Sequence, residues 1–342
     1  MKATANGRRG PVPTSSARGD HPALGRHRVN TIDLIPWIGA LTLFYLAPGY
    51  LALGTQILIM VLFALSLDLL LGYAGIVTLG HAVYFGIGAY TAGILSVHLG
   101  FNEPISGLLA AGALSGCIGL ATATIILRTH GLTFLMLTLT ILLMIGEGAN
   151  KASWLTGGAD GLQGVSIDPV LGLFRFDMFG RTGYLYALAV LFVVFVFVRT
   201  LTFSPYGRSL IGIRENAARM EAVGAPVRQR LIAIYGITAA LAGVAGALNT
   251  QTTQFVALNV LSFELSGAVL TMVILGGTGR LYGAFIGAPL YMVAQDYLAR
   301  LDPTYWFFWI GALLIIVVMF ARGGVLGLLD GALKLLAQRR GL

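Results

Sequence analysis

The sequence predicts an all-α membrane protein, a polytopic bundle of about ten transmembrane helices. Apolar residues make up 57% of the 342 residues, charged residues only 11%, and the mean hydropathy is +0.83. Average soluble domains carry about a quarter charged residues. Several apolar runs also reach the roughly 20 residues that cross a bilayer core, where helices satisfy their own backbone hydrogen bonds.

Apolar runs and their breakers place the ten expected spans. The eighth and ninth are short and are divided by the sequence GGTGR. The expected spans are 32–48, 52–72, 77–99, 105–127, 131–149, 183–202, 231–250, 261–276, 281–298 and 304–321.

The distribution of basic residues supports this count and predicts the orientation. Ten spans with a cytoplasmic N-terminus place 18 of the 22 Lys and Arg residues on the cytoplasmic side. Cytoplasmic loops of membrane proteins are enriched in these residues. We therefore expect both termini in the cytoplasm.

Four regions lie outside the spans. Residues 1–31 are rich in Arg, Gly, Ser and Pro and predict a disordered basic cytoplasmic tail, and residues 322–342 predict a second basic tail. The membrane domain is expected over 32–321, with a cytoplasmic loop at 204–230. The long external loop at 150–182 is interpreted either as a docking place for a soluble partner or as a plain ordered loop.

Glycine is abundant, with 46 residues, and part of it has helical spacing. Gly279, Gly283 and Gly287 form two consecutive GxxxG steps. Small residues at this spacing let helices approach closely in lipid. We expect these three glycines to serve helix packing.

Five ionisable residues are predicted at membrane depth or near its edges: Asp68, His81, Glu147, Glu264 and Asp296. Charges inside spans are costly, and they usually face the bundle interior or a cavity. Asp68, His81 and Glu264 are the candidates for a translocation pathway. Residues near the edges, such as Asp68 and Glu147, have the alternative of capping helices or reaching the interface.

Several functions are disfavoured by the composition. Each of the three lysines follows a residue other than glycine, so no P-loop is present, and no HExxH, GxSxG or clustered His and Cys ligands occur. We expect no catalytic residues, no cofactor and no metal site. The net charge of +8 is explained by basic loops beside membrane spans, so no nucleic-acid partner is expected.

The segment 204–230 gathers seven of the 36 charged residues between two apolar runs. Ser204 and Pro205 predict a helix start, and Gly224 predicts a helix end. The firm helix is expected over about 213–223. Its small apolar face is predicted to hold Ile213, Ala217, Met220 and Gly224.

Such a helix has two plausible uses. Its arginines could hold it on anionic lipid, but the apolar face is narrow and two glutamates offset part of the charge. Alternatively, it inserts into a groove of another protein, where small residues allow close contact. The groove interpretation is favoured.

At this point the sequence resembles a known family. RENAARMEAVGAP, at 214–226, is similar to the cytoplasmic EAA loop of ABC importer permeases. Three further runs occur in the same order as in branched-chain amino-acid permeases of the LivM type. They are LGYAGIVTLGHAVYFGIGAYTAG, LTGGADGL and VILGGTGRLYGAFIGA. The similar segments span most of residues 60–290.

The resemblance implies an inner-membrane subunit that works with a homologous permease, two cytoplasmic ATPases and a periplasmic substrate-binding protein. It implies a path for branched-chain amino acids and ATP hydrolysis on separate subunits. In the strict motif, two alanines directly follow the glutamate. Here Asn216 stands between Glu215 and the two alanines, so Glu215 and Glu221 both stay candidates for the position of the motif glutamate. The expected coupling residues are Arg214, Glu215, Ala217, Ala218, Met220, Glu221 and Gly224.

Other functions remain open from the residues alone. A stand-alone ion-coupled transporter or channel for a small polar solute could use the intramembrane ionisable residues. A membrane scaffold would show no transport. Similar permeases serve urea, amides and other amino acids, so the substrate is the least specified part of the prediction.

Overall fold

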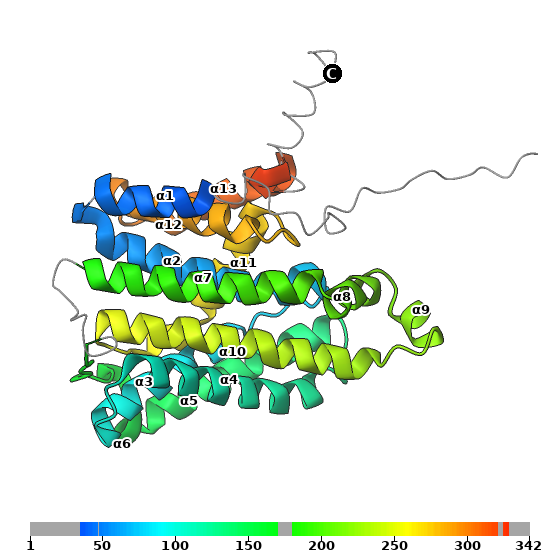
Figure 1. Cartoon of the computed structure of the whole chain (residues 1–342), viewed down its shortest axis with the longest axis horizontal. Helices are drawn as coiled ribbons and strands as arrows, with labels where there is room; N and C mark the ends of the chain where they lie inside the picture. Colours follow the sequence, from blue (N-terminus) through cyan, green and yellow to red (C-terminus); the bar gives the residue numbers. More distant parts are fainter. Residues whose placement is uncertain (1–34, 47, 170–179, 321–323, 328–342) are drawn as a thin grey trace, which may run out of the picture.

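The computed structural model describes residues 35–46, 48–169, 180–320 and 324–327. In these ranges long helices run side by side, and two short helices, α8 and α9, extend from one end of the bundle (Figure 1). The elements are α1 (Ile35–Leu46), η3 (Pro48–Tyr50), α2 (Leu51–Asp68), η4 (Leu69–Tyr73), α3 (Ala82–Leu99), α4 (Pro104–Ile126), α5 (Leu132–Lys151), α6 (Ser153–Thr156), η5 (Gly158–Asp160), α7 (Arg181–Phe203), α8 (Pro205–Glu215), α9 (Ala217–Ala222), α10 (Val227–Thr253), η6 (Leu258–Leu261), α11 (Phe263–Gly276), α12 (Gly283–Leu301) and α13 (Trp306–Phe320).

The predicted fold class is confirmed. Each of the ten expected spans coincides with a helix, namely α1, α2 with its π-helical extension η4, α3, α4, α5, α7, α10, α11, α12 and α13. Among the described residues, six helical stretches are long and apolar enough to cross a membrane, and two further apolar helices, within α1 and at α11, are shorter. The number of crossings and the side on which the termini lie stay predictions.

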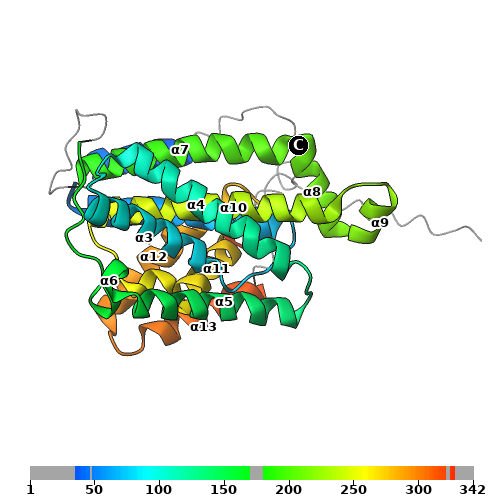
Figure 2. The same ribbon diagram turned by 90° about the horizontal axis from the view of Figure 1, so that it is seen from below.

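Helix α10 forms the centre of the bundle, packing against α4, α3 and α2 (Figures 1 and 2). Glycines bring α3 and α10 together. A Cβ atom on Gly88 would lie 2.0 Å from the carbonyl oxygen of Gly243, and one on Gly246 would lie 1.9 Å from that of Phe85. The contact therefore depends on bare backbone, as the glycine content predicts.

Helices α11 and α12 form a second close pair. A Cβ atom on Gly287 would lie 1.9 Å from the carbonyl oxygen of Met272, so this glycine serves helix packing. Gly283 is the first residue of α12 and lies against Gly276. Gly279, however, lies in the turn before α12 with φ +75°, so only one of the two expected GxxxG steps is helical.

The expected span 77–99 starts later than predicted. Residues 74–81 are not helical, and α3 begins only at Ala82. His81 lies beside Ser66 of α2, whose hydroxyl is 2.9 Å from Nε2 of the imidazole. Ser66 itself stands seven residues before Tyr73, the last residue of η4. Seven helical residues are about 10 Å. The chain therefore folds back into the bundle before α3 starts.

The long loop predicted at 150–182 is partly ordered. α5 extends to Lys151, α6 and η5 follow, and Leu162 pairs with Val256 in an isolated β-bridge. The hydroxyl of Thr156 donates to the carbonyl oxygen of Ala149 at 2.6 Å. This favours the interpretation as an ordered loop for residues 152–169; residues 170–179 lie outside the described part of the chain, as do the predicted tail 1–31 and most of 322–342.

Candidate functional site

A cavity of about 530 Å³ lies where α11 begins. This volume is in the range of 300–1,000 Å³ that is usual for small-molecule sites. Residues from six helices and from the segment before α11 contribute to its wall. They are Gln56, Met60, Phe85, Asn249, Asn259, Val260, Ser262, Glu264, Leu265, Ala268, Met272, Tyr291, Met292, Gln295, Trp306 and Phe307.

The chemistry of this wall is mixed. Met, Leu, Tyr, Phe and Trp side chains provide apolar surface, and four carboxamides and one serine provide hydrogen-bonding groups. Glu264 is the one ionisable carboxylate among the lining residues, which include no Lys or Arg. Such a wall suits a small solute with an apolar part and a positively charged group.

Local structure explains why the cavity is at this place. The hydroxyl of Ser262 accepts the backbone N–H of Leu265 at 3.1 Å, which caps α11. The cap fixes the start of α11 and puts Glu264 in its first turn, where the positive end of the helix favours a carboxylate. Glu264 is exposed in the single chain.

The structure does not bring the three predicted pathway residues together. Glu264 lines the cavity, whereas Asp68 and His81 are absent from its wall. The Ser66 hydroxyl donates to the carbonyl oxygen of Phe63 at 2.7 Å, so its oxygen is left to accept Nε2–H of His81. The imidazole also stacks on Phe63, with ring centroids 5.5 Å apart. His81 thus has a packing and hydrogen-bonding role.

Asp68 lies at the end of α2 and is only 2% exposed. Its Oδ1 accepts the backbone N–H of Gly279 at 2.7 Å. The two remaining ionisable residues form surface pairs along their own helices, Glu147 with Lys151 at 3.7 Å and Asp296 with Arg300 at 2.9 Å. Such exposed pairs contribute little to stability.

Sequence reasoning missed most of the cavity because it searched for ionisable groups. Gln56, Asn249 and Gln295 are uncharged polar residues inside long apolar helices. A search for carboxamides within the expected spans would have found them. The apolar wall residues carry no signal that separates them from ordinary core residues.

The second candidate site is the segment 204–230, which leaves the bundle after α7. As predicted, the Ser204 hydroxyl accepts the N–H of Gly207 at 3.2 Å, and Pro205 is the first residue of α8. Leu210 and Ile213 of α8 are buried, so this helix lies on the bundle. The hydroxyl of Tyr206 donates to the carbonyl oxygen of Arg230 at 2.8 Å. Burial raises the pKa of Tyr206 to about 12, against a smaller lowering by Arg230, so the hydroxyl keeps its proton.

The expected continuous helix over 213–223 is wrong. Asn216 is extended, with φ −160° and ψ 96°, and separates α8 from α9. Its side-chain oxygen accepts the N–H of Arg219 at 2.9 Å. Asn is a favoured N-cap because it satisfies a free amide at a helix start, and here that preference overrides helix continuation. Ile213 therefore does not share a helical face with Ala217, Met220 and Gly224.

The end of α9 follows the prediction. Gly224 has φ +86°, its N–H donates to the carbonyl oxygen of Glu221 at 2.8 Å, and the N–H of Ala225 donates to that of Met220 at 3.0 Å. This is the hydrogen-bond pattern of a Schellman ending.

Most of the expected coupling residues are exposed. Ala217, Ala218 and Glu221 project from α9, and Glu215 is exposed at the end of α8. Met220 instead packs back on Gly212, where an added Cβ would lie 2.9 Å from its Sδ atom. The segment presents a short exposed helix that is anchored by one methionine.

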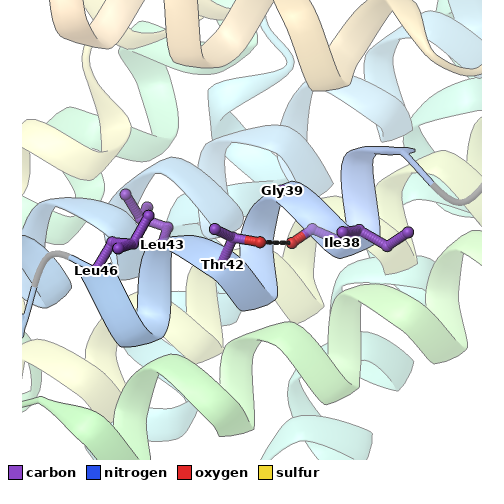
Figure 3. Close-up of a pocket in the computed structure, with 5 residues that line it drawn as sticks. All are labelled: Ile38, Gly39, Thr42, Leu43 and Leu46. Atoms are coloured by element: carbon purple, nitrogen blue, oxygen red, sulfur yellow. Dashed lines mark hydrogen bonds between the residues drawn. The ribbon is translucent and has the colours of Figure 1, made fainter.

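A further hollow lies on α1 and is lined by Ile38, Gly39, Thr42, Leu43 and Leu46 (Figure 3). All five residues belong to this one helix. The only side-chain hydroxyl among them, that of Thr42, donates to the carbonyl oxygen of Ile38 at 2.7 Å. The hollow therefore offers no convergent polar groups, and we assign it no role in transport.

The family described as "Branched-chain amino acid transport system / permease component" matches residues 49–319, which include the cavity and the segment 204–230. The chain belongs to this family. As a permease component it is a transport subunit and not an enzyme, and it is a multi-pass protein of the inner membrane.

Curated relatives of the permease agree with this assignment. The high-affinity branched-chain amino acid transport system permease protein LivM of Escherichia coli is 27% identical over 85% of the permease and 73% of the relative. A probable LivM of Methanocaldococcus jannaschii is 25% identical over 68% of the permease and 76% of the relative. The autoinducer 2 import system permease protein LsrC of an Enterobacter strain is 29% identical over 85% and 86%. No solved structure matches the permease.

Family membership decides between the alternatives that the residues left open. The permease is a LivM-type component of an ABC importer rather than a stand-alone carrier, channel or scaffold. Permeases of this family work with ATPase and substrate-binding partners in general.

Proposed function

We propose that the permease pairs with a homologous permease subunit and forms the passage for branched-chain amino acids. A periplasmic binding protein delivers the substrate, and two cytoplasmic ATPases drive transport. The observation that carries this proposal is the cavity at the start of α11, which is formed by α2, α3, α10, α11, α12 and α13.

The cavity supports an amino-acid substrate of medium size. Met60, Met272 and Met292 supply adaptable apolar surface for an aliphatic side chain. Glu264 supplies a negative charge for the α-ammonium group. Asn249, Asn259 and Gln295 supply amide donors for the carboxylate.

Relatives alone leave the substrate open. LivM proteins are named for branched-chain amino acids, and LsrC is named for autoinducer 2, yet their identities to the permease are similar. The carboxylate in the cavity favours a substrate with a cationic group and supports the amino-acid assignment over an uncharged solute.

The proposed ATPase contact is α9 with the end of α8. Ala217 and Ala218 allow close approach to a groove, and Glu221 adds a charge at its edge. For α9 to drive transport, the ATP-bound ATPases need only bind one of two permease conformations more tightly than the other. Glu221 is the better candidate for the motif glutamate, since it lies within α9, whereas Glu215 precedes the break at Asn216.

The test uses the full importer in proteoliposomes, with both permeases, the ATPases and the binding protein. Ala268→Trp places a bulky ring into the cavity, and we expect leucine uptake to fall at least about tenfold because the passage is filled. Ala113→Trp, on an exposed face of α4, is the matched control and should retain uptake.

Two results would contradict the proposal. If Ala268→Trp transports leucine as the wild type does, the cavity is not the passage. If the wild-type importer transports an uncharged solute and no amino acid, the substrate class is wrong.

A further inference from the structure

Arg214 of the coupling segment is turned toward the bundle rather than toward a partner. Its Nη1 donates a hydrogen bond to the carbonyl oxygen of Gly72, in the π-helical turn η4 that continues α2. The aliphatic part of the same side chain covers Gly75. A Cβ atom on Gly75 would lie 2.8 Å from Cγ of Arg214.

The acceptor Gly72 lies in a second close contact. A Cβ atom there would lie 2.4 Å from the backbone nitrogen of Gly279 and 2.5 Å from Oδ1 of Asp68. Oδ1 of Asp68 accepts the N–H of Gly279 at 2.7 Å. Any side chain at Gly72 would separate these groups.

Three separate parts of the chain therefore meet at one place. Asp68 and Gly72 belong to the end of α2 and η4, Gly279 to the turn between α11 and α12, and Arg214 to α8. We call Asp68, Gly72, Arg214 and Gly279 the junction. Figure 1 shows α8 beside this end of the bundle.

The charges at the junction complement one another. Asp68 is buried, and its second oxygen, Oδ2, has no hydrogen-bond partner among the described residues. A buried carboxylate needs a compensating charge. The Arg214 guanidinium lies beside the same turn, because a Cβ atom on Gly279, whose N–H bonds Asp68, would lie 3.4 Å from Nη1 of Arg214. Because the exposed end of α8 supplies this cation, displacing α8 would leave the carboxylate less compensated.

The junction also connects to the cavity. α2 carries the wall residue Met60, eight residues before Asp68, α11 carries Met272, and α12 carries Tyr291. Eight helical residues span about 12 Å. A rigid shift at the junction would therefore move three of the helices that form the cavity.

We propose that Arg214 and Asp68 are positioning residues that couple α8 and α9 to α2 and to the α11–α12 turn. This inference rests on the proposed role of the segment in ATPase contact. It assigns Arg214 to a contact within the permease, whereas Glu221 is assigned to the contact with the ATPase. A shift of α9 by the ATPases moves α8, and the junction carries that shift to the cavity.

The experiment measures leucine uptake and ATP hydrolysis by the complete reconstituted importer. Arg214→Ala removes the donor to Gly72 and the charge near Asp68. We expect uptake to fall about tenfold, as for a lost charged hydrogen bond, while ATP hydrolysis falls less than about twofold. Arg214→Lys keeps the charge and one donor and should recover part of the uptake. Arg208→Ala, an exposed arginine on the same helix, is the matched control and should keep the wild-type ratio of uptake to hydrolysis.

A second measurement separates a role in coupling from a purely structural role. Asp68→Asn keeps the oxygen that accepts the Gly279 amide and removes the charge. If Asp68 and Arg214 act together, the double variant loses hardly more uptake than the worse single variant, because coupled residues are not additive. Amounts of inserted, monodisperse protein are compared for all variants.

The outcomes are distinct. Equal losses of uptake and hydrolysis in Arg214→Ala, or losses in the double variant that multiply, would overturn the junction as a coupling device. A wild-type importer with no leucine uptake would instead overturn the proposed function. Wild-type uptake with an unchanged ratio in Arg214→Ala would leave the function standing and reject this inference.

Discussion

The backbone N–H of Ala82 donates a hydrogen bond to the hydroxyl of Ser266 at 3.1 Å, so α3 and α11 begin next to each other inside the bundle. Unpaired N–H groups at a helix start carry partial positive charge. Phe85 of α3 and Glu264 of α11 both contribute to the cavity wall. The two helix starts thus lie beside the proposed passage.

Ser266→Ala tests that contact. Ser266 is buried, so its loss leaves the Ala82 amide without an acceptor, and we expect a destabilisation of about 1–3 kcal/mol. Thr271→Ala is the control, because within the described part of the chain that hydroxyl bonds to Gly267 of its own helix and to no other element. Thermal unfolding in detergent measures both, and equal melting temperatures would contradict the prediction.

Gly246→Ala tests the contact between α3 and α10. The added methyl group would lie 1.9 Å from a carbonyl oxygen of α3, and we expect overpacking to cost about 1–3 kcal/mol. Gly148→Ala, where no atom lies within 4 Å of the added group, should be tolerated. The yield of monodisperse protein and its melting temperature are the measurements.

Glu264→Gln tests the charge in the cavity. The glutamine has nearly the same shape, so the passage stays open, but the partner of the substrate ammonium is lost. We expect leucine uptake to fall about tenfold or more, as for a lost charge pair. Glu147→Gln is the control on the surface of α5. Full uptake by Glu264→Gln would show that the carboxylate does not recognise the substrate.

Asn216→Ala tests the division between α8 and α9. Loss of the cap should destabilise α9 by about 1 kcal/mol, whereas Asn216→Ser should preserve it. Hydrogen exchange of the amides at 217–222 reports the opening of this helix. Faster exchange in the alanine variant and near wild-type exchange in the serine variant are expected, and identical rates in all three proteins would argue against the cap.

His81→Ala separates packing from proton transfer. The imidazole fills space beside Phe63 and bonds Ser66, so its removal should destabilise the protein by about 2–4 kcal/mol. Uptake by the wild-type importer, supplied with ATP, should resist a proton uncoupler, because the energy comes from the ATPases. Loss of uptake with the uncoupler while ATP is maintained would point to a proton path.

Periodic apolar runs predicted the helices well, because a long apolar run has few other solutions in lipid. The prediction that the span of α3 begins at residue 77 is wrong, because the stretch 77–81 is largely apolar yet not helical. Its hydrogen bonds and packing come from distant parts of the chain, such as Ser66 at His81 and Thr138 near Gly80. A local pattern contains no information about such partners.

The site was predicted less completely. Glu264 was found because a charge in an apolar run is costly, but the carboxamides beside it are far less conspicuous. Asp68 is a pathway candidate by sequence, and the structure adds a contact that the sequence does not indicate, with Gly279, 211 positions away; its pathway role stays a prediction. The break at Asn216 depends on competition between two helix endings, which spacing alone does not decide.

Asn216 also has a consequence for how such importers diversify. Because α9 has its own start at Asn216 and its own end at Gly224, its exposed residues can change while Met220, α8 and the junction stay in place. Changes in α9 would alter which motor the permease accepts, and changes around Glu264 would alter its cargo. The proposed ATPase contact and the proposed substrate contact thus lie in separate parts of one chain.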